Sequence, residues 1–282
     1  MPELPEVETS KRYIERFLLN AKILNIQSYV SKLRWEIHPD INFFFNNTII
    51  LKIDRIGKYI LINTSNKNTL ILHLGMSGYL SINEANFKKV KHDHIIINFE
   101  CITGEKKSLI FNDQRRFGHI DFHYTSNLKK HFLIKNLGID GLSKSIKYEF
   151  LKKIFSKKTI VIKSALLDQK IICGIGNIYA SEILFYSKIH PLKKVNNLCK
   201  DEINSLLHNI YIVLSKAVRN GGTTIKDYKQ PNGKVGYFKQ KLKVYGREKL
   251  KCYDCSSIIL KLNINKRATY ICPECQKHQL IN

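Results

Sequence analysis

Long apolar runs are missing from this chain of 282 residues. No segment reaches the roughly 18–20 uninterrupted apolar residues that a helix needs to cross a bilayer. The segment 1–17 carries charges throughout and lacks the apolar centre of a secretory signal. We therefore expect a cytoplasmic protein without membrane association.

Acidic residues are scarce, with 23 Asp and Glu against 47 Lys and Arg, which gives a formal charge of +24 at pH 7. Such an excess favours a polyanionic partner, nucleic acid above all. The chain is also rich in Ile, Asn and Lys, the composition that AT-rich coding sequence produces. The charge by itself leaves both interpretations open.

A disulfide framework is not expected, because the seven cysteines are an odd number in a chain without a secretion signal. Four of them form two CxxC pairs with 16 residues between the pairs: Cys252, Cys255, Cys272 and Cys275. Four thiolates at this spacing can close a tetrahedral site with no position open for water, so we expect one structural Zn²⁺. Accidental or redox-active cysteine pairs are the alternative. Cys101, Cys173 and Cys199 are isolated and are interpreted as packing residues.

The segment between the two cysteine pairs is rich in β-forming residues over 257–269, and we expect a hairpin there. It carries Lys261, Lys266 and Arg267. These cations could contact phosphates, or they could simply be solvated.

Periodicity divides the rest of the chain. A helix is expected from Glu6 to about Leu19, with its apolar side chains on one face. Short β-type runs follow up to about Tyr124, which predicts an antiparallel sandwich or barrel with the helix packed on it. The clearest runs are Ile23–Ile26, Thr48–Ile53, Tyr59–Asn63, Thr69–Leu74, His94–Phe99 and Ser108–Phe111.

Helical spacing returns between about Leu128 and Asn220. A glycine-punctuated connection within it ends at Asn177, which we expect to be a helix N-cap. Residues 221–246 are interpreted as a long loop, and the last ~35 residues as a separate small unit. The expected helices are Phe150–Phe155, Ala165–Leu167, Ile178–Tyr186 and Glu202–Val218.

The opening MPELPEVE has a chemical interpretation. Removal of the initiator methionine would leave Pro2 as a secondary amine, which can attack C1′ of deoxyribose and form an iminium ion. An α-amine has a reference pKa of ~7.7–8, so much of it is neutral near pH 7. Glu3 could protonate the sugar ring oxygen. Proline and glutamate are also common at helix starts without any chemistry.

Together these motifs closely resemble the bacterial formamidopyrimidine-DNA glycosylases, also called 8-oxoguanine DNA glycosylases, over essentially the full length. The resemblance rests on an ordered set of motifs: MPELPEVET at 1–9, GKY at 57–59, HLGMSG at 73–78, KHDH at 91–94, DQRRFG at 113–118, GIGNIYASE at 174–182, GGTTIKD at 221–227, VYGR at 244–247 and the four cysteines.

The resemblance implies an α+β fold: an N-terminal antiparallel β-sandwich with a leading helix (1–130), a helix–two-turn–helix domain with a lesion-capping loop (131–242) and a zinc hairpin (243–282). It implies a monomer that acts in base-excision repair on double-stranded DNA at the bacterial nucleoid. The family removes oxidised purines and cleaves the abasic site by β,δ-elimination. The alternative is an endonuclease VIII-like enzyme for oxidised pyrimidines, and a non-catalytic zinc-ribbon DNA-binding protein is a third possibility.

The resemblance also assigns roles to individual residues. It implies that Pro2 is the Schiff-base nucleophile, Glu3 the acid and Glu6 a support of the helix start. Lys58 matches the lysine to which the family's β-elimination step is assigned. Arg267 matches the residue to which δ-elimination is assigned. DNA contacts are implied for His92, Arg115, Lys158 and Asn177. Met76, Arg115 and Phe117 match the residues that fill the gap left by a flipped base, and residues 223–237 match the loop that closes over that base.

Overall fold

The computed structural model describes residues 1–223 and 238–277. Contacts group these residues into two units: unit 1 holds residues 1–135 and 220–223, and unit 2 holds residues 136–219 and 238–277. The four-cysteine segment groups with the helices of unit 2, whereas the sequence suggested a boundary after residue 242. The three-part division stays a prediction.

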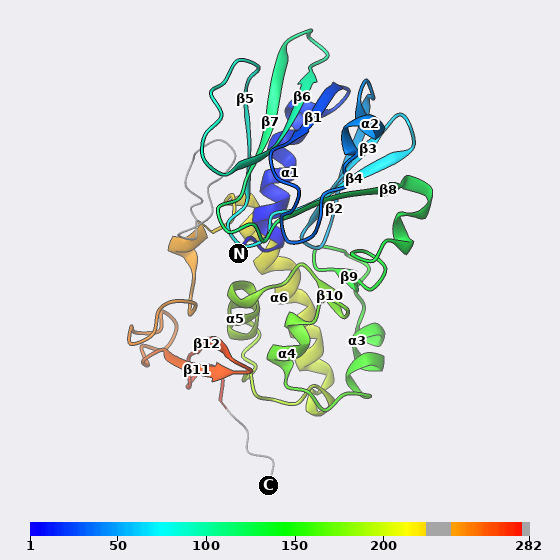
Figure 1. Ribbon diagram of the computed structural model, residues 1–282. Coiled ribbons are helices and arrows are strands. Elements are labelled where there is room, and N and C mark those ends of the chain that lie inside the picture. The colour runs from blue at the N-terminus through cyan, green and yellow to red at the C-terminus, as the bar shows by residue number, and fades with distance from the viewer. Residues whose placement is uncertain (224–237, 278–282) are drawn as a thin grey trace. The chain divides into compact units, whose positions relative to one another are not determined.

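Unit 1 contains two four-stranded antiparallel sheets, which confirms the expected sandwich (Figure 1). One sheet has the order β1-β6-β7-β5 and the other β2-β3-β4-β8. The strands of the first sheet are β1 (Lys22–Ser28), β5 (Tyr79–Glu84), β6 (Asp93–Glu100) and β7 (Lys106–Asn112). Those of the second are β2 (Ile50–Ile56), β3 (Tyr59–Thr64), β4 (Asn68–His73) and β8 (His119–Tyr124).

Helix α1 (Leu4–Leu18) packs against β2 and β3 of one sheet and β5 of the other (Figure 1). Its buried residues Val7, Ile14 and Leu18 recur at helical spacing and join the apolar core between the sheets. The helix begins two residues earlier than the sequence predicted. Proline is tolerated in a first turn, where its missing N–H has no partner to lose, so Pro5 does not delay the start.

The remaining helical elements of unit 1 are short. They are α2 (Ile41–Phe45) and the 3₁₀ helix η1 (Thr125–Lys130). Strands β5 and β8 were not among the runs singled out from the sequence, although both lie inside the segment expected to be β-rich.

Unit 2 is mainly helical. Helix α6 packs against α3 and α5, and α5 also packs against α4 and β12. Its elements are β9 (Ile139–Asp140), α3 (Tyr148–Phe155), α4 (Ile162–Leu167), β10 (Ile172–Cys173), α5 (Asn177–Tyr186), the 3₁₀ helices η2 (Val195–Asn197) and η3 (Phe238–Lys241), α6 (Lys200–Arg219), β11 (Leu260–Ile264) and β12 (Arg267–Ile271).

The four expected helices of this region are present as α3 to α6. Strands β11 and β12 pair antiparallel and form the hairpin expected between the cysteine pairs. Within the segment 221–246 that was expected to be a loop, Phe238–Lys241 is a 3₁₀ helix, and residues 224–237 lie outside the described part. In residues 1–223 and 238–277, no helix combines the length and the apolar character that crossing a membrane requires.

Candidate active site

The start of α1 is held by a reciprocal pair of carboxylates. Glu3 is the N-cap, and its side chain accepts from the backbone N–H of Glu6 while the Glu6 side chain accepts from the backbone of Glu3. The Glu3 N–H to Glu6 Oε2 distance is 2.9 Å. Pro2 is buried directly before this cap, and Glu3 is only 3% exposed. The fold therefore fixes the backbone that carries the two residues expected to perform the chemistry.

The second oxygen of Glu6 reaches a segment more than 200 residues away in the sequence. Its Oε1 accepts from the backbone N–H of Thr223 at 2.7 Å and from the Thr223 hydroxyl at 2.9 Å. The neighbouring Gly222 has φ +75°, and a Cβ there would lie 2.7 Å from Glu6 Oε1. Glu6 is fully buried, so its carboxylate ties the helix start to residues 222 and 223.

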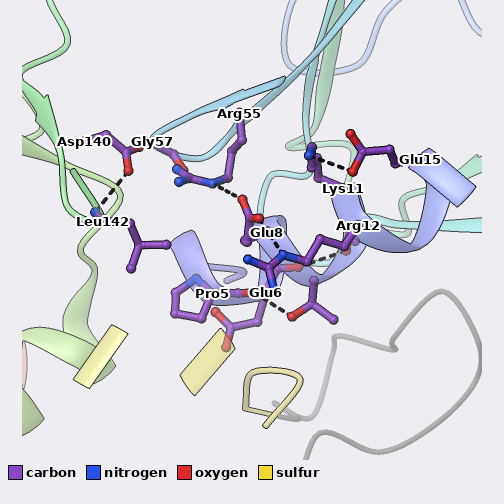
Figure 2. A network of polar contacts seen from close by, with 12 residues as sticks. Pro5, Glu6, Glu8, Lys11, Arg12, Glu15, Arg55, Gly57, Asp140 and Leu142 are labelled. Atoms are coloured by element: carbon purple, nitrogen blue, oxygen red, sulfur yellow. Dashed lines mark hydrogen bonds and ion pairs between the residues drawn. The ribbon is translucent and has the colours of Figure 1, made fainter. Parts of the chain in front are cut away.

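Lys58 lies in the tight turn between β2 and β3, next to Gly57 with φ +57°. Figure 2 shows how this turn is held near α1. Arg55 donates through Nε to Glu8 Oε2 at 2.8 Å and through Nη1 to the Gly57 carbonyl at 2.9 Å. Burial raises the pKa of Glu8, but the hydrogen bonds and charges of Arg55 and Arg12 outweigh it, and the net pKa is lowered. Glu8 is therefore an anion that holds Arg55 and, through it, the turn at Gly57 and Lys58. Lys58 itself is 8% exposed.

Two loops of unit 1 meet at Asp113, which is fully buried. Its Oδ1 accepts from the Ser77 hydroxyl at 2.7 Å, and its Oδ2 accepts from the backbone N–H of Gly118 at 2.6 Å. The approach of the loops is close, since a Cβ on Gly75 would lie 2.3 Å from the backbone carbon of Phe117. One carboxylate thus joins the loop 74–78 to the loop 113–118.

Those loops carry the three residues expected to fill a vacated base position. Met76 lies beside Ser77, and the Arg115 guanidinium lies over the Phe117 ring at 5.0 Å from its centroid. The backbone N–H of Arg115 donates to Ser77 Oγ at 3.1 Å. Arg115 and Phe117 are exposed and Met76 is half-buried. The structure therefore brings the three together on one loop pair of unit 1, with Arg115 and Phe117 open to a partner.

His92 is half-buried and has φ +73°, a backbone conformation that is uncommon outside glycine but that His, Asn and Asp adopt more often than other residues. Its carbonyl accepts from the backbone N–H of Asp113 at 3.0 Å, and its ring lies 5.9 Å from that of His94. His94 Nε2 is in turn 3.0 Å from the Asp113 carbonyl oxygen. His92 is thereby fixed to the base of the loop that carries Arg115.

In unit 2, Asn177 does not have the expected role of N-cap. The N-cap of α5 is Gly176, and no side chain caps this helix within the described residues. Tertiary structure overrides the local preference, because the Asn177 amide donates to the Ala268 carbonyl at 2.8 Å. Asn177 is therefore the first residue of α5 and is bound to the hairpin.

Arg267 is exposed and is the first residue of β12, next to Ala268. Asn177 and Arg267 are thus brought to the same part of unit 2. Lys158 is half-buried and follows α3, with its N–H donating to the Phe155 carbonyl at 3.1 Å. Among the described residues, no hydrogen bond or ion pair joins Lys158 to Asn177 or to Arg267.

The four paired cysteines converge in unit 2. Their Sγ atoms all lie within 4.8 Å of one another, with 4.0 Å between Cys252 and Cys275 and 3.3 Å between Cys255 and Cys272. This cluster can bind a metal ion. Of the other cysteines, Cys173 is buried and Cys101 half-buried, but Cys199 is exposed, so its interpretation as a packing residue is wrong.

Sequence reasoning did not single out Glu182, although it lies inside a quoted motif. It is 1% exposed and accepts from three successive backbone N–H groups, those of Lys243, Val244 and Tyr245, at 2.8–3.0 Å. Burial raises the pKa of Glu182 overall, although the three N–H groups and Arg247 favour its anion. The signal was available, because Glu182 is the one charged residue of helix α5.

Known proteins match the chain over nearly all of its length. Residues 1–120 match the profile of the formamidopyrimidine-DNA glycosylase N-terminal domain, and residues 137–229 match that of the formamidopyrimidine-DNA glycosylase H2TH domain. The formamidopyrimidine-DNA glycosylases of Rickettsia felis and Rickettsia conorii are 45% and 46% identical over 276 residues. Those alignments cover 98% of this chain and 98% and 99% of the relatives.

Solved structures agree. The Lactococcus lactis Fpg (MutM) in complex with DNA containing Fapy-dG is 32% identical, with a TM-score of 0.89, and the match covers 98% of this chain and 100% of that chain. A complex of the same enzyme with DNA containing an oxidised pyrimidine is 31% identical with the same TM-score and coverage. Because relatives at this identity span almost the whole chain, this protein belongs to the formamidopyrimidine-DNA glycosylase family of base-excision repair enzymes.

Proposed function

We propose that this protein excises 8-oxoguanine and formamidopyrimidines from duplex DNA and cleaves the abasic site by β,δ-elimination, with Pro2 as the nucleophile. The observation that carries the proposal is the placement of Pro2, buried directly before Glu3 at a helix start that the Glu3–Glu6 pair fixes. An imino nitrogen and a carboxyl group are thus adjacent on one rigid element.

The chemistry requires that Met1 be removed, which leaves the Pro2 nitrogen as a secondary amine. That nitrogen forms a bond to C1′ of the damaged nucleotide as the bond from C1′ to the base breaks, and the proton that the amine loses balances the one that the departing base takes up. Glu3 then donates a proton to the sugar ring oxygen as the C1′–O4′ bond opens, which leaves an iminium ion between Pro2 and C1′. The iminium ion has no N–H proton to lose and so remains an electron sink. It acidifies the C2′ hydrogen, and loss of this proton expels the 3′-phosphate.

Two cations serve the eliminations. Lys58, held in its turn by the Arg55 contacts, assists β-elimination near the sugar. Arg267 binds the phosphates that flank the lesion and helps the 5′-phosphate leave in the second elimination. A guanidinium suits this role because it stays charged and presents several donors to a phosphate.

Base flipping leaves a gap in the duplex and costs a few kcal/mol of stacking and pairing. Met76 and Phe117 fill this gap, and Arg115 pairs with the orphaned base. The exposure of Phe117 and the cation–π contact of Arg115 support the assignment, because an exposed aromatic ring on a braced loop can stack on a base.

Phosphates along the strand are contacted by His92, Lys158 and Asn177. The positive end of the α5 dipole at Gly176 and Asn177 favours an anion there. The loop expected to close over the damaged base, residues 223–237, lies outside the described part of the chain apart from Thr223. The enzyme acts as a monomer on the cytoplasmic DNA of the nucleoid.

The four-cysteine cluster fits zinc. A Zn–S bond of about 2.3 Å places the sulfurs of a tetrahedral site about 3.8 Å apart, close to the 3.3 and 4.0 Å separations of the two Sγ pairs. Cys252, Cys255, Cys272 and Cys275 would hold one Zn²⁺ with no position open for water. When bound, the ion supplies folding free energy to a segment with a small apolar core of its own.

A panel of duplexes tests the proposal. We expect single-turnover excision to be fastest with formamidopyrimidine or 8-oxoguanine opposite C, and slower with dihydrothymine or thymine glycol. The pyrimidine lesions belong in the panel because a related structure holds an oxidised pyrimidine. A preference for them over both purine lesions would overturn the proposal in favour of an endonuclease VIII-like enzyme.

A further inference from the structure

The hairpin that carries Arg267 ends in a tight two-residue turn. Strands β11 and β12 pair up to Ile264 and Arg267, and the two residues between them, Asn265 and Lys266, have φ +51° and +61°. A two-residue loop with both residues at positive φ is a type I′ turn, which matches the twist of the strands and in which Asn is favoured. Arg267 therefore follows a turn of defined geometry.

Two side-chain hydrogen bonds attach this turn to the helices of unit 2. The Asn265 amide donates to the Ser164 hydroxyl on α4 at 2.7 Å, and the Asn177 amide on α5 donates to the Ala268 carbonyl at 2.8 Å. The two contacts lie on either side of Arg267 in the sequence. Each bonded residue of the hairpin is within two positions of Arg267, so together the two bonds restrain the backbone position of Arg267.

The two helical positions are themselves joined through a buried lysine. Lys163 precedes Ser164 on α4 and is 1% exposed. Its ammonium donates to the Asn177 carbonyl at 3.2 Å and to the Ser181 hydroxyl at 2.7 Å. Burial of an ammonium is costly unless it is well bonded, so this contact is a strong constraint on how α4 and α5 lie against each other. The attachment points of the hairpin turn are therefore fixed relative to one another.

The metal cluster has separate attachments. Glu182 accepts from the backbone of residues 243–245, and the Gln276 amide donates to the Ile189 carbonyl at 3.0 Å. The core beside the cysteines is formed by Phe185, Val244, Ile259 and Tyr270. The Asn265–Ser164 bond lies at the turn of the hairpin, involves none of these residues and is exposed to solvent. Its loss should leave the metal cluster and its core in place.

We propose that Ser164 and Asn265 are positioning residues for Arg267, and that their hydrogen bond controls the second elimination more than the first. This rests on the proposed role of Arg267 in releasing the 5′-phosphate. Without the bond, the turn is held on one side only, by Asn177, and the guanidinium samples positions away from the departing phosphate. The first elimination depends on Pro2 and is expected to proceed unchanged.

The test uses a preformed abasic site in duplex DNA and measures the ratio of β,δ-product to β-product in a single turnover. The variants are Ser164→Ala and Asn265→Gly, because glycine keeps the positive φ of the turn while removing the amide. We expect each to lower the ratio on the order of fivefold, as for loss of one hydrogen bond. The double variant should lower it no further, since both changes remove the same bond.

Controls separate positioning from general damage. Asn263→Ala changes an exposed residue of β11 in the same hairpin and should leave the ratio unchanged. Bound metal, measured in every variant, should equal that of the parent. Metal loss in Ser164→Ala would overturn the inference, because the bond would then serve the fold of the whole hairpin.

The variant Arg267→Ala distinguishes the positioning role of Ser164 and Asn265 from the proposed role of Arg267 itself. If Arg267→Ala leaves the ratio unchanged, the proposed role of Arg267 fails. If it lowers the ratio while Ser164→Ala and Asn265→Gly do not, the role of Arg267 stands and the positioning inference is overturned.

Discussion

The hydroxyl of Ser77 donates a 2.7 Å hydrogen bond to the buried carboxylate of Asp113. The same carboxylate accepts from the Gly118 backbone, so one side chain couples the loop with Met76 to the loop with Arg115 and Phe117. Both loops must keep this spacing if their side chains are to enter the gap left by a flipped base. Asp113 thus supports the loops that carry Met76, Arg115 and Phe117, although it is not one of the expected DNA contacts.

Asp113→Asn should weaken that support. An amide keeps one oxygen but directs an N–H group at either Ser77 or the Gly118 N–H, and an unsatisfied buried donor costs about 1–3 kcal/mol. We expect the free energy of unfolding to fall by that amount and base flipping to be slower. Flipping is measured through the fluorescence of 2-aminopurine placed next to the lesion. Asp201→Asn, at an exposed position of α6, is the control. Parent-like flipping in Asp113→Asn would show that the loops do not need this carboxylate.

Glu3→Gln should slow base excision more than cleavage of a preformed abasic site. The amide oxygen of glutamine can still accept from the Glu6 N–H, so the helix start is preserved while the acid is removed. The measurement compares single-turnover rates on 8-oxoguanine opposite C and on an abasic site. Glu15→Gln, which changes a carboxylate later in α1 that pairs with Lys11, should affect neither rate. Equal losses on both substrates would mean that Glu3 is not the acid for base loss.

His73 should make the stability of unit 1 depend on pH. Burial lowers its pKa to about 3, and the charges of Lys58, Arg34 and His119 add to the effect. An unfolded histidine titrates near pH 6.5, so below that pH the unfolded chain binds a proton that the folded chain does not. Stability due to His73 is therefore present above about pH 6.5 and is lost as the pH falls toward 3, by up to about 1.4 kcal/mol per pH unit.

His73→Asn removes this titration, and its amide oxygen can replace Nδ1 as the acceptor for the Gly75 N–H. Urea unfolding between pH 7 and pH 5 should show a shallower loss of stability in the variant than in the parent. His208→Asn, at an exposed position of α6, should keep the parental slope. Identical slopes for His73→Asn and the parent would contradict the lowered pKa.

Removal of the metal should weaken DNA binding by disordering the hairpin that presents Arg267. A charge-assisted hydrogen bond to phosphate is worth about 1.5–3 kcal/mol, which corresponds to a rise in Kd of about tenfold or more. Binding is measured with chelator-treated protein after its metal content has been determined. In the Arg267→Ala variant, which already lacks this contact, removal of the metal should raise the Kd by a smaller factor. An unchanged Kd after verified loss of the metal would refute this role of the hairpin.

Much of the candidate site could be predicted because its chemistry lies in short contiguous motifs. Pro2 and Glu3 are adjacent, and the spacing of the cysteine pairs is itself a sign of a metal site. Helix α1 could be predicted because its apolar face repeats at helical spacing. Strand β8 was missed although its signal was present, because His119, Asp121 and His123 alternate with Ile120, Phe122 and Tyr124 in the pattern of a half-buried strand.

Contacts between distant segments could not be predicted in the same way. Asn177 has the local chemistry of an N-cap, yet its amide is bonded to a carbonyl 91 residues away. The bond from Asn265 to Ser164 spans 101 residues, and nothing near either residue indicates the other. Such pairs depend on how helices and hairpin pack, which a single sequence does not display as a local pattern.

In the proposed mechanism, the nitrogen of Pro2 forms the covalent bond to the sugar. Borohydride trapping on a duplex with 8-oxoguanine opposite C, followed by mass spectrometry of the N-terminal peptide, tests it most directly. We expect an adduct on Pro2 of chains that have lost Met1, and neither adduct nor strand cleavage from chains that retain it. Full cleavage activity in protein shown to retain Met1 would mean that a group other than the Pro2 nitrogen forms this bond.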